Sequence, residues 1–450
     1  MKKRVQIFLI CAAATLPGWN VRAASDVALK NPGAIPSGAL SNCVACQIIL
    51  VAPHGHDESD QAMLKLQQRI KTSPLPGPFI EQLGWRLVSK ARTANDPGLY
   101  NLVEQCALCL EAQQPENPAA WLLRGHALQS LHKFKEAEPV ARKLVAKRGA
   151  SFDFGLLGDV LMDRGQVTEG IAAYQKMMDL KPDLHSYTRA AHARWIKGDV
   201  TGALELISMA TSAGSSRDAE ATAWSYTRRA AYEMQLNQPS DSLHSVRVAL
   251  RLQPDDAAAW FFQGRIQLMQ GQTNDALPSL QRAVSLSPLP EYQWILADVL
   301  NLVGKPNDSV EANLHKRGAQ EDPRSFALYL ATRREQPEAA VKLTERELAE
   351  RADIFTHDAL AWALFAAGKF PEARQQSTLA LTEGTEDARL FFHAAIIAEV
   401  NGDSKQAVAF SQKVAPIQQM LFPSEQQQLA ELNGRLVGAL TQAKITETSK

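Results

Sequence analysis

Residues 257–288 read AAAWFFQGRIQLMQGQTNDALPSLQRAVSLSP, and this stretch decides the fold. Gly271 and Pro288 are of the residue types that follow the end of a helix, so they mark the ends of two successive helices. Gly264 and Ala276 lie inside those helices, and their small side chains let the two helices cross at close range. The stretch therefore predicts a helical hairpin.

The same spacing of small residues, glycine and proline recurs along the chain. We count seven good units and three degenerate ones, the latter over residues 85–115, 290–322 and 325–351. The good units begin at Pro118, Ser151, Leu184, Ala223, Ala257, Ile354 and Ala388. This register resembles the 34-residue tetratricopeptide repeat (TPR), and the chain is similar to exported bacterial TPR proteins. The resemblance covers about residues 84–415 and implies an all-α, right-handed α-solenoid of helix pairs.

The other segments set the predicted domain organisation. Residues 1–23 are expected to be a signal peptide, and residues 24–80 an irregular Cys- and Pro-containing segment with one short helix near residues 60–71. Residues 81–415 are expected to form the TPR array. Residues 416–450 should supply a capping helix and a tail, because the last repeat of a solenoid needs a polar cover.

The N-terminus has the three-part layout of a secretory signal. Basic residues 2–4 precede an apolar run over residues 5–16, and Val21-Arg22-Ala23 suits cleavage after Ala23. The apolar run is too short to span a bilayer, which takes about 20 residues. We therefore expect an exported protein, periplasmic or secreted. A lipid attached to Cys11 and an uncleaved membrane anchor are the alternatives.

Charge and motifs restrict the class of function. The 48 basic and 48 acidic residues of the chain cancel, and loss of residues 1–23 leaves a net charge near −4. A weakly acidic protein lacks electrostatic attraction for nucleic acid or anionic lipid. No glycine-rich phosphate loop, HExxH or GxSxG motif occurs. We predict no enzyme, no cofactor or metal, no nucleic acid partner and no membrane insertion after cleavage.

The TPR resemblance implies a binding groove, because the first helices of successive repeats usually line a concave face that accepts a partner segment. Aromatic and arginine side chains, which contribute much of the binding energy at interfaces, occupy several of these positions here. The predicted groove residues are His126, Asp159, His192, Trp195, Trp224, Phe261, Arg265, Trp362 and Phe365. The alternative is that these side chains pack against neighbouring helices.

Four cysteines outside the leader form two CxxC pairs, Cys43 with Cys46 and Cys106 with Cys109. An even number of cysteines in an exported protein favours disulfides, so we predict that all four are disulfide-bonded, with the connectivity open. A bridge between the two pairs would fix the N-terminal segment to the first repeat unit. The alternatives are a four-thiolate zinc site and free or redox-active thiols.

These observations lead to two functional interpretations. The first is an exported scaffold or adaptor that binds a protein or peptide partner of unknown identity through its repeats. The second is a metal- or thiol-handling protein that uses the two CxxC pairs, with the TPR array as a docking platform.

Overall fold

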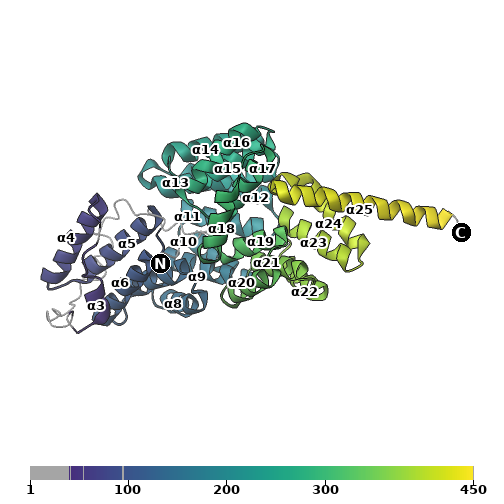
Figure 1. Cartoon of the computed structure of the whole chain (residues 1–450). Coiled ribbons are helices and arrows are strands. Elements are labelled where there is room, and N and C mark those ends of the chain that lie inside the picture. Colours follow the sequence, from purple (N-terminus) through teal and green to yellow (C-terminus); the bar gives the residue numbers. More distant parts are fainter. Residues whose placement is uncertain (1–39, 41, 54, 94–95, 449–450) are drawn as a thin grey trace. The chain divides into compact units, whose positions relative to one another are not determined.

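The computed structural model describes residues 40, 42–53, 55–93 and 96–448, with side chains up to residue 438 except that of Thr93 (Figure 1). Every regular element within these ranges is a helix, which confirms the predicted all-α fold. No helix in the described part is long and apolar enough to cross a membrane. The predicted signal peptide and Cys11 lie outside the described residues.

The helices divide into two compact units. Unit 1 comprises the described residues up to Pro182 together with Ser215–Glu220. Its elements are α3 (Val44–Ile48), α4 (Glu58–Thr72), α5 (Gly77–Thr93), α6 (Leu99–Gln113), α7 (Pro118–Ser130), α8 (Phe134–Lys147), α9 (Ser151–Asp163), α10 (Val167–Leu180) and the 3₁₀ turn η1 (Ser216–Asp218).

Unit 2 comprises Asp183–Gly214 and Ala221–Lys450. Its helices are α11 (Leu184–Ile196), α12 (Val200–Ala213), α13 (Ala219–Gln235, whose first two residues count with unit 1), α14 (Pro239–Leu252), α15 (Ala257–Met269), α16 (Thr273–Leu286), α17 (Pro290–Leu302), α18 (Asp308–Glu321), α19 (Pro323–Arg333), α20 (Pro337–Glu350), α21 (Ile354–Ala366), α22 (Phe370–Ala380), α23 (Ala388–Val400), α24 (Ser404–Val414), η2 (Ala415–Met420) and α25 (Pro423–Thr448).

The hairpin of α15 and α16 shows why the repeat pattern folds in this way. Gly264 lies where the two helices touch, and a Cβ atom there would be 2.6 Å from Leu280 Cγ. Ala276 and Ala283, on the second helix, are completely buried. Gly271 adopts a φ of +73° in the turn, a conformation that favours glycine and ends α15. The small residues of the sequence pattern are therefore the contact points of the hairpin.

In unit 2, an aspartate is the N-cap residue of the first helix in many of the repeats. The Asp256 carboxylate accepts hydrogen bonds from the amides of Ala258 and Ala259 at the start of α15. Asp183, Asp322, Asp353 and Asp387 act in the same way at α11, α19, α21 and α23. Such N-caps satisfy amides that have no partner inside the helix and typically contribute about 1 kcal/mol each.

The N-terminal segment contains more helix than its composition indicates. Helix α4 extends over the expected short helix near residues 60–71, and α3 is an additional helix. Asp57 caps α4 by accepting from the Asp60 amide at 2.7 Å, and both carboxylates form ion pairs with Lys90 of α5. These contacts, with a buried apolar cluster that includes Ile70 and Ile80, attach α4 to the repeats of unit 1.

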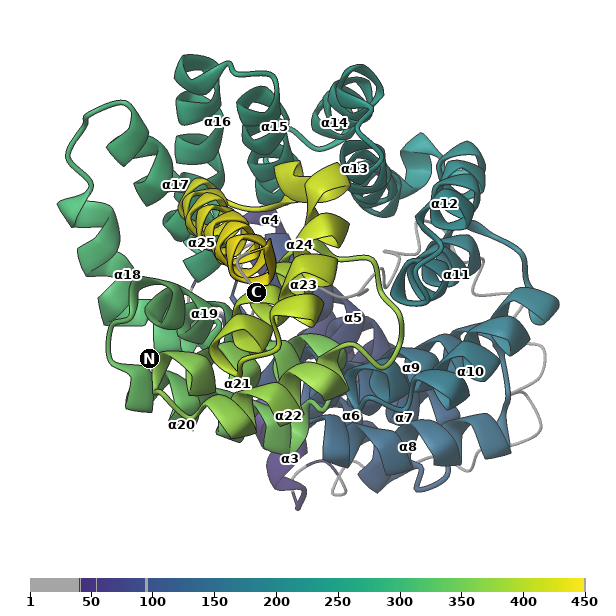
Figure 2. The ribbon, with the colours of Figure 1, turned by 90° about the vertical axis from the view of Figure 1, so that its right-hand side faces the viewer.

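The last described helix, α25, packs on unit 2 only along its first part. Leu429, Leu432 and Leu436 are buried, and Arg435 forms a two-contact ion pair with Glu399 of α23 at 2.8 and 2.7 Å. Beyond these residues the helix extends away from the other helices of unit 2 (Figure 1). The start of α25, with α23 and α24, lies inside the arc formed by the preceding helices of unit 2 (Figure 2).

Candidate functional site

The first helices of the repeats in unit 2 face an inner segment of the same chain. This inner segment, residues 415–428, consists of η2 and the start of α25 and lies inside the arc (Figure 2). Gln419 Nε2 donates to the carbonyl oxygens of Met234 and Gln235 at 3.1 and 3.2 Å. Arg265 donates to the carbonyl oxygen of Met420 at 2.6 Å. The chain's own backbone thus occupies the face on which a partner segment was expected.

Phe422 is the main apolar contact of the inner segment. Its side chain is 0% exposed, and its ring packs edge-on against Trp294 at 5.0 Å and Phe261 at 6.2 Å between centroids. The guanidinium groups of Arg265 and Arg389 lie 5.4 and 4.9 Å from the centre of the same ring. Complete burial of such a ring stabilises the fold by about 1.5–3 kcal/mol, and the cations add to this.

Polar contacts fix the two residues that follow Pro423. The amide and hydroxyl of Ser424 both donate to Asp298 Oδ2, at 3.0 and 2.6 Å, and Trp294 Nε1 donates to the Ser424 hydroxyl at 3.0 Å. Burial raises the pKa of Asp298 to about 6, although the bonds from Ser424 oppose that shift. Glu425 is 0% exposed and forms an ion pair with Arg389 at 2.5 and 3.2 Å. Both residues are thus held by polar contacts to other helices of unit 2, and Glu425 is part of its buried core.

A second segment of the chain, the loop at residues 383–387, contacts the same side of unit 2. Gln235 Nε2 donates to the carbonyl oxygen of Glu386 at 2.6 Å, and the Thr385 hydroxyl donates to the carbonyl oxygen of Ile196. The approach at Gly198 is so close that a Cβ atom there would lie 2.5 Å from the Gly384 carbonyl oxygen. The helices that contain Ile196 and Gln235 are therefore in contact with the loop at residues 383–387, and the helix that contains Arg265 is in contact with the inner segment.

Three predicted groove residues of unit 2 contact these later segments or helices. Phe261 is 0% exposed and stacks on Tyr292 at 4.5 Å. Arg265 is buried beside Phe422, and this burial lowers the pKa of its guanidinium to about 10. Trp195, half-buried, stacks on Phe355 of α21 at 5.7 Å. All three side chains make the intramolecular contacts of the packing alternative.

The remaining groove candidates of unit 2 are also packed within it. Trp362 stacks on His393 at 4.0 Å and on Phe365 at 4.6 Å, and its Nε1 donates to Thr332. Trp224 is half-buried, with Arg228 6.0 Å from its ring centre. Buried His192 lies 5.8 Å from the Trp195 ring.

Among the predicted groove residues, His192 has a strongly lowered pKa. Burial, aided by the nearby positive charge of Arg228, lowers its pKa to about 3, and Asp353 opposes the shift. The imidazole is therefore neutral at physiological pH, as expected for a core side chain.

The two groove candidates of unit 1 are buried as well. His126 lies between Trp85 and Tyr100, with ring centroids at 5.6 and 6.1 Å. Asp159 accepts a hydrogen bond from the Tyr174 hydroxyl at 2.9 Å. The use of any of the nine predicted groove residues by a partner stays a prediction, and the structure assigns each of them intramolecular contacts.

Unit 2 also has a pocket that is open to solvent. Its cavity volume is about 540 Å³, and its walls come from the end of α19, the α21–α22 turn, the end of α23 and the middle of α25. It is lined by Arg334, Phe365, Ala366, Gly368, Phe370, Ile396, Glu399, Val400, Gln428, Glu431 and Arg435. Phe370 and Val400 are 36% and 37% exposed, so apolar surface is accessible here. Phe365 is the predicted groove residue that reaches this pocket.

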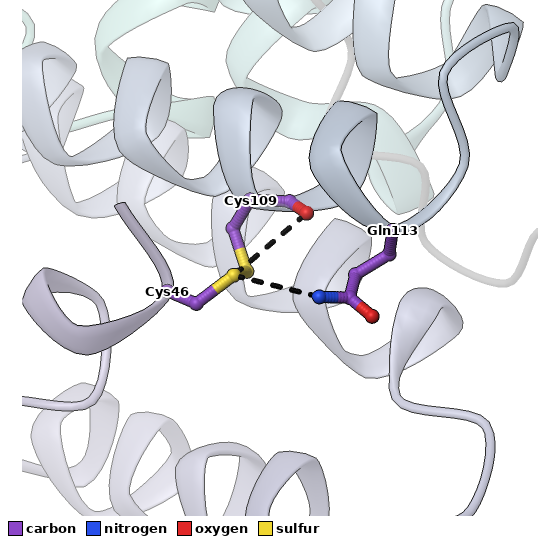
Figure 3. The surroundings of a disulfide bond; sticks show 3 residues. All are labelled: Cys46, Cys109 and Gln113. Atoms are coloured by element: carbon purple, nitrogen blue, oxygen red, sulfur yellow. Dashed lines mark hydrogen bonds between the residues drawn. A yellow bond between two sulfur atoms is a disulfide. The ribbon is translucent and has the colours of Figure 1, made fainter. Parts of the chain in front are cut away.

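The four cysteines of the two CxxC pairs, all within the described residues, form one disulfide in place of the predicted two. Cys46 of α3 is bonded to Cys109 of α6, so of the pairings that the sequence left open the structure has one that links the N-terminal segment to the first repeat unit (Figure 3). Cys43 and Cys106 are free thiols, and their assignment to a disulfide was wrong. Cys106 is completely buried one helical turn before Cys109, and burial raises the pKa of its thiol. Cys43 lies beside the disulfide: the sulfur atoms of Cys43, Cys46 and Cys109 are within 4.8 Å of one another.

Successive antiparallel helix pairs with small residues at their contacts define a helical-repeat protein. Residues 227–301 match the family model described as Tetratricopeptide repeat, so the helix pairs in this part of the chain are repeats of that type. The recognition of TPR units from the sequence is thereby confirmed.

Similar proteins share only parts of this chain or its general fold. Superkiller complex protein 3 of Mus musculus is 27% identical over 154 residues, which are 34% of this chain and 10% of that protein. Tetratricopeptide repeat protein 37 of Xenopus laevis is 29% identical over 114 residues, which are 25% of this chain and 7% of that protein. The chain thus spans a tenth or less of the curated relatives it matches.

Solved structures that are similar to this chain superimpose on it with low TM-scores. A human IFIT1 dimer with PPP-AAAA has a TM-score of 0.46 at 18% identity, over 72% of this chain and 78% of that one. The APC/C hetero-tetramer Cut9-Hcn1 has a TM-score of 0.35 at 14% identity, over 85% of this chain and 96% of that one. Likenesses at this level do not indicate what this chain binds.

Proposed function

We propose that this chain is an exported scaffold that binds a protein partner at the open pocket of unit 2 and catalyses no reaction. Tetratricopeptide repeats support a role in protein–protein interaction. The observation that carries the proposal is the solvent-exposed apolar surface of Phe370 and Val400, within a cavity of about 540 Å³. A cavity of this size accepts a few side chains of a partner.

The chemistry of the pocket indicates what such a partner presents. Phe370 and Val400 offer an apolar contact, and the ion pair of Glu399 and Arg435 lies at the same rim. Arg334 adds a guanidinium 5.9 Å from the centre of the Phe365 ring. A protein segment with an apolar side chain flanked by polar groups matches this arrangement, because interfaces combine an apolar centre with a polar rim.

Two parts of this proposal, export and a protein as the partner, are supported by the sequence. The basic, apolar and small-residue regions of the leader support a route to the periplasm or the medium. The net charge near −4 without the leader opposes electrostatic binding of nucleic acid. Fractionation of cells that express the tagged chain tests the location: we expect a processed protein outside the cytoplasm, and an unprocessed cytoplasmic protein contradicts export.

The pocket is tested by cross-linking and affinity purification from the compartment in which the chain is found. We expect the double variant Phe370→Ala/Val400→Ala to lose partners that the parent chain captures. Leu302→Ala is the matched control, because Leu302 is 61% exposed on unit 2 and is not a pocket residue. Identical partner sets for parent, pocket variant and control would refute binding at this site.

A further inference from the structure

The half-buried thiol of Cys43 lies next to a disulfide to which it is not bonded. Cys43 immediately precedes α3, and its Sγ is within 4.8 Å of the sulfur atoms of both Cys46 and Cys109. Cys46 and Cys109 are each 0% exposed, so reagents in solution do not reach their sulfur atoms directly. Cys43 is therefore the cysteine of this group whose thiol is accessible from solvent.

Two other interpretations of these cysteines fit less well. A metal ion would need thiolates, and two of the three sulfur atoms in the group are bonded to each other. Cys106 is close in sequence to Cys109, but it is fully buried, lies outside the three-sulfur group, and has a thiol pKa raised by burial. Low thiolate content makes a cysteine a poor nucleophile.

We propose that Cys43 is an exchange thiol for the Cys46–Cys109 disulfide. The Cys43 thiolate attacks Cys109 Sγ, a Cys43–Cys109 bond forms, and the Cys46–Cys109 bond breaks. Cys46 leaves with the electron pair of the broken bond and takes up the proton that Cys43 released. The chain has one disulfide before and after the step, so the exchange needs no oxidant or reductant.

One contact of Cys46 favours it as the leaving group, against its burial and the Cys109 carbonyl oxygen 3.8 Å from its sulfur atom. The side-chain amide of Gln113 donates toward Cys46 Sγ at 3.9 Å (Figure 3). An N–H donor at this position stabilises negative charge on the sulfur atom as it leaves. Because Cys43 flanks the same short helix as Cys46, the new bond still links α3 to α6. The exchange thus changes which sulfur is free without separating α3 from the repeats.

Alkylation followed by mass spectrometry tests the exchange in the folded full-length chain. With iodoacetamide at mildly alkaline pH and no reductant, we expect each chain to take one label in this group, because alkylation of Cys43 ends the exchange: the label lies on Cys43 in most chains and on Cys46 in those that exchanged before alkylation. Cys43→Ser should abolish labelling of Cys46, and Gln113→Leu should lower it. Cys106→Ser is the control and should leave it unchanged. Absence of Cys46 labelling in the parent chain, or equal labelling in Cys43→Ser, overturns the proposal.

A second variant tests the geometry without relying on rates. In Cys46→Ser the proposal requires a Cys43–Cys109 disulfide after air oxidation, with complete loss of the Cys43 label. A freely labelled Cys43, or pairing of Cys43 with Cys106, contradicts the placement of the three sulfur atoms. Circular dichroism confirms that each variant is folded before labelling. These readouts do not depend on partner binding, so they are independent of the scaffold proposal.

Discussion

Arg265 donates a hydrogen bond to the carbonyl oxygen of Met420 at 2.6 Å, although 155 positions separate the two residues. The same guanidinium lies 5.4 Å from the centres of the Phe261 and Phe422 rings. The first helices of the repeats in unit 2 thus bind the chain's own inner segment. We therefore expect substitutions on this side to change stability first.

Phe422→Ala should destabilise unit 2. The ring is fully buried against Trp294 and Phe261, and truncation of such a side chain leaves a cavity that costs about 3–5 kcal/mol. Denaturant unfolding followed by circular dichroism measures the change. Phe370→Ala is the control, because Phe370 is 36% exposed, and it should change stability much less. Equal effects for the two variants would mean that the inner segment is not part of the core.

His192 should make the fold sensitive to acid. Its folded pKa is about 3, below the value of 6.5 for an unburied imidazole, so the unfolded state binds the proton first as the pH falls. The stability present above pH 6.5 is therefore lost between about pH 6.5 and pH 3, by a few kcal/mol in all.

Thermal unfolding at several pH values measures this loss. His192→Gln removes the titrating group and should flatten the pH dependence over that interval relative to the parent chain. The neighbouring charges of Arg228 and Asp353 are retained in the variant, so the difference isolates the imidazole. An unchanged slope would show that the imidazole is protonated equally in both states.

Gly264→Ala should destabilise the α15–α16 hairpin. The added Cβ would lie 2.6 Å from Leu280 Cγ, and overpacking of this kind typically costs about 1–3 kcal/mol. Gly434→Ala in α25 is the matched control, since a Cβ there meets nothing within 4 Å. In an open helical position alanine is favoured over glycine by about 1 kcal/mol. The two substitutions should thus shift the thermal unfolding midpoint in opposite directions, and a shift of the same sign would contradict the close crossing.

Reduction of the Cys46–Cys109 disulfide should lower the free energy of unfolding. The bond closes a sequence separation of 63 residues, for which the chain-entropy relation gives about 4 kcal/mol. Thermal unfolding with and without a reductant measures the effect. The double variant Cys46→Ser/Cys109→Ser should no longer respond to the reductant, and a persisting response would assign the stabilisation to other thiols.

Much of the fold could be predicted because each repeat depends on local residues. Gly264, Gly271 and Ala276 specify a close crossing and a turn within one hairpin, and such features are visible in a short window of sequence. The contacts of the inner segment were missed, since Phe422 packs against Phe261 and Ser424 bonds to Trp294, each more than a hundred positions away. The available signal was the apolar pair Leu421-Phe422, within the segment 416–450 that was expected to supply the capping helix.

By itself, the sequence determined the class of fold and the repeat unit, because periodic small residues act within one hairpin, whereas it left the pairing of the cysteines open. Only the tertiary structure decided that aromatic side chains such as Phe261 contact the chain's own later segment, and that Cys43 remains a thiol beside the Cys46–Cys109 disulfide. Both outcomes depend on how successive hairpins bring distant residues together. The course of the chain over several hairpins is the sum of many small helix-packing angles, and no single repeat encodes that sum.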